Sequence, residues 1–173
     1  GADEDFLISE FPAQLARILE GFSQVSYVLG ENSSIETQIL QTLSELRKRD
    51  RHGMIYPTQV VDLREILHEQ RLIKDEDTLA AMRKAAKISI DAHLKVMCSI
   101  QPGQFEYEID AQLAYEFRRK NAVHAYQSIV AAGKNGTILH YTDSQSQLMG
   151  GELLLVDAAC QWQHVASDIT RTY

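Results

Sequence analysis

The sequence predicts a mixed α/β chain whose second part is an α+β unit, in which two helices are followed by a β-meander. Three observations lead to this prediction. Apolar residues recur at helical spacing in several stretches before Asn121. Beyond Asn121 the chain changes to short segments rich in β-branched and aromatic residues, separated by Gly133, Asn135-Gly136 and Gly150-Gly151. A hydrophobic content of 45% over 173 residues suffices for one substantial core or two small ones.

The first part of the chain predicts a small α/β unit. A helix is expected over residues 12–22, with Pro12 suited to its first turn, and a short strand is expected over residues 25–29. The next helix is expected to begin at the capping candidates Ser33 and Ser34 and to continue through Leu46. Residues 54–56, directly before a proline, predict another short strand.

A connecting helix over residues 60–74 places the boundary between two domains, which cover residues 1–62 and 63–173. Asp75 and the two acidic residues after it favour the start of a long helix, which ends before Pro102-Gly103. The helix that follows carries Ile109, Leu113 and Phe117 one turn apart and is expected to end near residue 121. Strand-like segments then cover residues 128–132, 137–141, 153–159 and 165–173.

Charge and cysteine content argue against several classes of function. The balance of 17 Lys+Arg against 24 Asp+Glu gives a net charge of -7, so nucleic acid is not an expected partner. The basic cluster from Arg47 to Arg51 is interpreted as a solvated helix end. The sequence has no run of about 18 apolar residues and no signal-peptide pattern at the N-terminus, so no membrane partner is expected. Cys98, expected to pack within a helix, and Cys160 show no CxxC spacing; we therefore predict a reducing, cytoplasmic location.

Two acidic residues near the end of the chain form the most informative pattern. If residues 161–164 are the loop of an antiparallel hairpin, Asp157 lies directly opposite Asp168. Direct cross-strand neighbours have Cβ atoms about 4.5–5.5 Å apart, where like charges are destabilising unless they are neutralised. A divalent cation or a pair of them would neutralise these charges, as would a proton shared between the two acids. Exposed and uncoupled acids remain a third interpretation. Carboxylate ligands suit manganese, magnesium or zinc.

Two other side chains are candidates for the same site. His140 follows a glycine-bearing turn, and a histidine there is able to bind metal, to position a substrate or simply to pack. Tyr126 is by default a core aromatic residue whose hydroxyl group needs a partner. The other histidines show no spacing typical of a ligand set, and we interpret them as surface or core residues.

A series of motifs, in this order and spacing, resembles the creatinase and methionine-aminopeptidase superfamily, most closely its Xaa-Pro aminopeptidase (aminopeptidase P) branch. The motifs are EQRLIKD at 69–75, RKAA at 83–86, Pro102-Gly103 followed by Glu106 and Glu108, GKNGTILHYT at 133–142, VDA at 156–158 and SDITRT at 167–172. The resemblance implies the end of a creatinase-type N-terminal domain followed by the first half of a pita-bread catalytic domain. It also implies that the chain is a fragment, and the start at Gly1-Ala2 rather than at Met suggests either a tag remnant or an excised fragment.

The resemblance further implies the chemistry of the site. Asp157 would hold one metal ion and Asp168 would bridge two, together with one His and two Glu from later in the family's chain. The ions are expected to be manganese, with zinc, cobalt and magnesium as alternatives. His140 would contact the substrate, and Tyr126 would hydrogen-bond the bridging Asp168.

The expected activity is release of the N-terminal residue from a peptide with proline in second position. A prolidase acting on dipeptides and a non-catalytic pita-bread module that binds peptides or proteins are the alternatives. The fragment alone is expected to be inactive because two carboxylates make an incomplete site. Its final strands would leave open edges, so we also expect a homo-oligomer.

Overall fold

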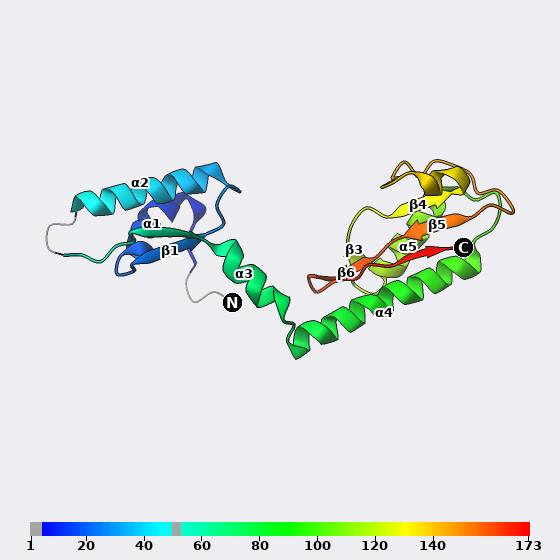
Figure 1. The fold of residues 1–173 in the computed structure, drawn as a ribbon, viewed down its shortest axis with the longest axis horizontal. Coiled ribbons are helices and arrows are strands. Elements are labelled where there is room, and N and C mark those ends of the chain that lie inside the picture. The colour runs from blue at the N-terminus through cyan, green and yellow to red at the C-terminus, as the bar shows by residue number, and fades with distance from the viewer. Residues whose placement is uncertain (1–4, 50–52) are drawn as a thin grey trace. The chain divides into compact units, whose positions relative to one another are not determined.

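The computed structural model describes residues 5–49 and 53–173. The chain forms two compact units, Gly1–Ile73 and Lys74–Tyr173. The expected domain boundary between residues 62 and 63 falls at the start of helix α3 (Leu63–Leu72). The two units divide after Ile73, so α3 groups with the first unit. The mixed α/β class is confirmed, with helices and short strands in both units (Figure 1).

The first unit packs helices on a small parallel sheet. Its elements are the 3-10 helix η1 (Ile8–Glu10), α1 (Phe11–Leu19), β1 (Gln24–Tyr27), α2 (Ser33–Arg49), β2 (Gln59–Asp62) and α3. Strands β1 and β2 pair in parallel, from Gln24 opposite Gln59 to Tyr27 opposite Asp62. The core lies between α1 and α2, where the helical repeats bury one face of each helix: Leu15, Leu19, Ile39, Leu43 and Leu46.

Two predictions for this unit are wrong in detail. The cap of α2 is Asn32, whose Oδ1 accepts hydrogen bonds from the backbone N–H groups of Ser34 (3.1 Å) and Ile35 (3.2 Å). Residues 54–56 do not form a strand; β2 begins instead at Gln59, and its last three residues replace the start of the connecting helix expected over residues 60–74. The valines of β2 suit an extended backbone, and the parallel partner β1 stabilises it.

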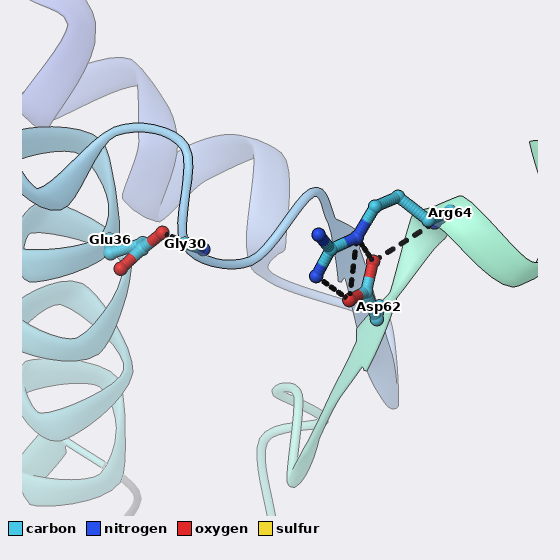
Figure 2. Close-up of polar contacts among 4 residues, drawn as sticks. All are labelled: Gly30, Glu36, Asp62 and Arg64. Atoms are coloured by element: carbon cyan, nitrogen blue, oxygen red, sulfur yellow. Dashed lines mark hydrogen bonds and ion pairs between the residues drawn. The ribbon is translucent and has the colours of Figure 1, made fainter.

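The junction between β2 and α3 is held by a carboxylate cap (Figure 2). The Asp62 carboxylate accepts a 3.0 Å hydrogen bond from the Arg64 backbone N–H and also binds the Arg64 guanidinium. These bonds lower the pKa of Asp62 to about 2. Figure 2 also shows Glu36 in the first turn of α2 accepting a 2.6 Å bond from the Gly30 N–H, which fixes the turn after β1.

The second unit contains two long helices and two small antiparallel sheets. Its helical elements are α4 (Glu76–Ser99), α5 (Glu106–Arg118) and the 3-10 helix η2 (Gly133–Thr137). One sheet has the strand order β3-β6-β7 and the other β4-β5-β8. The strands are β3 (Val123–His124), β4 (Ile129–Ala132), β5 (Leu154–Asp157), β6 (Cys160–Trp162), β7 (Val165–Ala166) and β8 (Thr170–Thr172). One core joins both helices to both sheets.

Helix α5 confirms the sequence prediction directly, because Ile109, Leu113 and Phe117 are all fully buried. Helix α4 begins as predicted, with the Asp75 side chain accepting a 2.8 Å bond from the Thr78 N–H. The large apolar residues whose helical spacing predicted α4 do not mark its buried face, because four of them are more than a third exposed: Met82, Ile90, Leu94 and Met97.

The buried face of α4 is made mostly of small side chains: Ala81, Ala85, Ile88, Ser89, Ala92, His93 and Val96. Small residues allow the helix to lie close to β6 and β7, which it contacts. Cys98 lies outside this face and is exposed, so its expected packing is wrong, whereas Cys160 is buried.

Residues 137–141 do not form the expected strand. Thr137 instead ends the 3-10 helix η2, which is closed by a 3.0 Å hydrogen bond from the Ile138 N–H to the Asn135 carbonyl, and residues 138–140 form a turn. His140 then takes a left-handed conformation with φ of 54°, which ends any extended run. Apolar residues at 138 and 139 suggested a strand, yet both are exposed.

Candidate functional site

The hairpin that carries the two acids turns one residue later along the chain than the sequence suggested. Its loop is Gln163-His164, with φ of 47° and 65°, between the paired residues Trp162 and Val165. Positive φ at both central residues is the geometry of a type I′ turn, which matches the twist of the strands on either side.

Because of this shift, the predicted direct pairing of Asp157 with Asp168 is wrong. The Cα partner of Asp157 is Thr170, and Asp168 precedes β8 by two residues. A displacement of two residues keeps a side chain on the same face of a sheet, whereas a displacement of one would reverse it. Asp168 is therefore a diagonal neighbour of Asp157 on one face.

The hydroxyl group of Tyr126 joins the two acids. It lies 2.6 Å from Asp157 Oδ1 and 2.8 Å from Asp168 Oδ1, so both carboxylates converge on one donor from the segment between β3 and β4. Burial raises the pKa of Tyr126, and the hydrogen bonds to the two carboxylates raise it further. The tyrosine therefore stays protonated as a donor across the physiological pH range.

Two buried polar residues of α4 hold the chain where the strands leave one sheet for the other. Ser89 Oγ accepts a 2.9 Å bond from the Cys160 N–H and lies 2.8 Å from Ser167 Oγ. His93 Nε2 donates to the Ala158 carbonyl at 2.9 Å, because a carbonyl oxygen only accepts. Ala158 follows Asp157 and Ser167 precedes Asp168. The helix thus fixes the backbone beside each acid, and the sequence interpretation missed this because it treated His93 only as a surface or core residue.

His140 shares a pocket with Asp157. Both residues line a pocket of about 300 Å³ whose remaining walls come from β4, β5, β8 and the segment after η2. Its lining is mostly apolar: Ile129, Ala131, Ile138, Leu139 and Leu155. The structure thus places His140 and Asp157 at one cavity, and Asp157 and Asp168 at one hydroxyl group.

The acid pair fits part of a metal site. Asp168 is exposed and Asp157 is half-buried, so their oxygens are accessible to a cation, and carboxylates are preferred ligands of hard divalent ions. Two carboxylates alone do not complete such a site. Within residues 5–49 and 53–173, no cluster of three or more His, Cys, Asp or Glu side chains could hold a metal ion.

The other described histidines do not join the acids. His124 Nδ1 bonds to Ser128 Oγ at 2.9 Å, and its ring packs edge-on against Phe117. His164 lies exposed in the hairpin turn.

As for membranes, the helices in the described part of the chain include none with the length and apolar character to cross a bilayer.

Comparison with known proteins gives concordant results. The model of metallopeptidase family M24 matches residues 80–173. The chain is 36% identical to the Xaa-Pro aminopeptidase of Escherichia coli K12 over its whole length, and 34% identical over 99% of its length to that of Haemophilus influenzae. It spans 40% and 37% of these relatives, respectively.

Solved structures agree. Aminopeptidase PepP of Pseudomonas aeruginosa superimposes with a TM-score of 0.93 at 41% identity, over all of this chain and 39% of that one. Proline aminopeptidase P II of Yersinia pestis gives a TM-score of 0.91 at 35% identity, over 99% of this chain and 40% of that one. The family model covers more than half of the sequence, and these aminopeptidases share the fold of this chain along nearly its whole length. The chain therefore belongs to metallopeptidase family M24.

Proposed function

We propose that this chain is part of a two-metal aminopeptidase that releases the N-terminal residue from peptides with proline in second position. The observation that carries the proposal is the convergence of Asp157 and Asp168 on the Tyr126 hydroxyl group, at 2.6 and 2.8 Å. Two carboxylates held this close on one face suit cations as neutralising partners. The relatives in Escherichia coli and Haemophilus influenzae carry the name of this activity.

In this proposal the four site residues Asp157, Asp168, Tyr126 and His140 have separate roles. Asp157 would hold one ion and Asp168 would be the ligand shared by both, while the Tyr126 O–H orients the two carboxylates. His140 contacts the peptide in the pocket that it lines together with Asp157. Two bound divalent ions, manganese first with zinc, cobalt or magnesium as alternatives, would supply Lewis-acid stabilisation of charge on the scissile carbonyl.

The remaining ligands are proposed to lie outside these 173 residues, because the chain spans about 40% of its relatives. The chain alone should therefore show no turnover of an Xaa-Pro peptide when manganese is added. Robust turnover by the purified 173-residue chain would contradict this part of the proposal.

The activity is tested in a longer protein that contains the chain and reaches the length of its relatives. With manganese it should cleave a tripeptide with proline in second position, and D157N and D168N should each abolish cleavage and lower the bound metal. Cleavage of Xaa-Pro dipeptides alone would identify a prolidase instead. A protein that binds no metal and cleaves neither substrate would indicate a non-catalytic module.

We also propose a cytoplasmic homo-oligomer with peptides as its substrates. Cys98 and Cys160 are both free thiols, which suits a reducing compartment. All three residues of the edge strand β8 are exposed, which leaves its backbone open to a partner strand.

A further inference from the structure

We propose that Glu106 is a positioning residue that holds His140 at the pocket it shares with Asp157; this inference rests on the proposed function. Glu106 begins α5, yet its side chain points into the protein and is fully buried. Residues 133–146, here named the His140 loop, run from the end of β4 past His140 and back to Glu106. Buried charges are rare unless they are fully hydrogen-bonded, so the contacts of this carboxylate require an explanation.

The loop and the strand before it supply every bond that the structure shows to this carboxylate. Glu106 Oε1 accepts from the Ala132 N–H at 2.7 Å and from Asn135 Nδ2 at 2.9 Å. Glu106 Oε2 accepts from the Tyr141 O–H at 2.7 Å and from the Ser146 N–H at 2.9 Å. Burial alone would raise the pKa of Glu106, but these four donors outweigh it and the pKa is lowered. The carboxylate therefore stays charged and acts as a fixed acceptor for both ends of the loop.

The middle of the loop is tied to the same point. Asn135 Nδ2 lies 3.1 Å from the Tyr141 hydroxyl oxygen and 2.9 Å from Ser146 Oγ, so the donors of the loop also contact one another. The Glu106 backbone N–H donates to the Ser146 carbonyl at 3.0 Å, which closes the loop against the start of α5. Glu106, Asn135 and Tyr141 are buried and Ser146 is half-buried, and polar contacts in such surroundings rigidify the chain.

His140 depends on this network because it lies next to Tyr141. The Tyr141 side chain is buried and bonded to Glu106, whereas Leu139 on the other side of His140 is 86% exposed. His140 itself is exposed and has φ of 54°, a conformation that persists in a non-glycine residue only when its surroundings impose it. The anchored Tyr141 imposes it from one side and η2 from the other. Glu106 thus sets the direction of the imidazole without contacting it.

The test uses E106Q in the longer protein that contains this chain. Glutamine keeps the size of the side chain but replaces one acceptor oxygen with an NH₂ group that faces two donors. We expect kcat/KM for the tripeptide to fall about 10- to 100-fold while the bound metal per protein stays unchanged, since a displaced substrate-contacting group costs rate without removing a ligand. E108Q is the matched control. Glu108 lies in the same helical turn, and E108Q removes the same charge. The Glu108 carboxylate, however, accepts a hydrogen bond from the Phe105 N–H, outside the His140 loop.

A double-mutant cycle with H140A separates positioning from general stability. If Glu106 acts through His140, E106Q should cost little further activity in the H140A background. Losses that add in full would overturn the proposal. Y141F, which removes a single donor to Glu106, should give a smaller loss in the same direction and should likewise be non-additive with H140A. It provides the same test should E106Q fail to fold.

Amide hydrogen exchange tests the structural step without any activity. In the 173-residue chain, exchange of residues 133–146 should be faster in E106Q than in the unaltered chain and unchanged in E108Q. Equal protection in E106Q and the unaltered chain would overturn the inference. If the longer protein cleaves no Xaa-Pro peptide, the proposed function fails, while the exchange result still decides whether Glu106 holds the loop.

Discussion

Replacement of Tyr126 by phenylalanine should destabilise the second unit by about 1.5–2 kcal/mol in the absence of metal. The hydroxyl group has a single proton, so its two short contacts count as one hydrogen bond to a charged acceptor, worth about 1.5–3 kcal/mol. The lower part of that range applies, because Asp168 is exposed and water replaces the lost donor there. In the longer protein, Y126F should weaken metal binding roughly 10- to 100-fold.

Urea unfolding of the 173-residue chain measures the effect on stability. Trp162 is the only tryptophan of the chain and packs against the core of the second unit, so its fluorescence follows that unit alone. Y126F should lower the midpoint without a change in m. Y115F is the control, because the Tyr115 side chain is 64% exposed, and it should change stability by less than about 0.5 kcal/mol.

The stabilisation by the Tyr126 hydroxyl group should depend on pH and on the two acids. The folded pKa of Tyr126 is raised, so the stability that its hydroxyl group contributes is complete below the unfolded pKa of about 10 and is lost as pH rises toward the folded value. The difference between the unaltered chain and Y126F should therefore shrink above about pH 10. It should also largely disappear when Asp157 and Asp168 are both replaced by Ala, which removes both acceptors of the hydroxyl group. An undiminished difference in that background would show that the hydroxyl group does not act through the acids.

Three further predictions concern the rest of the second unit. F117A should destabilise it by about 3–5 kcal/mol, since Phe117 is fully buried, whereas Y115A at the exposed position should stay within about 0.5 kcal/mol by the same fluorescence assay. Because the folded pKa of Glu106 is lowered, its stabilisation is present above the unfolded pKa of about 4.3 and should be lost as pH falls below it; a chain equally stable at pH 3 and pH 6 would contradict this. The open strand β8 should promote self-association, and a constant monomer mass across a dilution series in light scattering would contradict that expectation.

The helices could be predicted because their signals are local. The Asp75 cap and the one-turn repeat of Ile109, Leu113 and Phe117 each lie within a few residues, and the structure confirms both. The strand β2 was missed because four residues carry too little periodicity to separate a strand from a helix start, and its parallel partner β1 lies far back in the sequence. The buried face of α4 could not be predicted either, since its alanines are buried only because strands distant in the sequence pack against them.

For the candidate site, the residues could be predicted from the sequence, whereas their pairing could not. The sequence pattern and the family resemblance brought together Asp157, Asp168, Tyr126 and His140, and the structure shows which pairs of them meet. The hairpin register was wrong by two residues because the loop length was inferred from polarity rather than from turn geometry. Glu106 was quoted only as part of a motif: an acidic residue at the start of a helix already has an adequate local explanation in the helix dipole, so nothing in the sequence revealed its buried contacts.

The two-residue turn at Gln163-His164 makes this hairpin unusually sensitive to length. Surface loops generally accept an inserted or deleted residue at little cost. Here a single inserted residue would shift the register of the returning strand by one. The Asp168 carboxylate would then lie on the opposite face of the sheet from Asp157. Natural variants should therefore differ in the identity of these two residues, with Asn-Gly favoured by the backbone, far more readily than in their number.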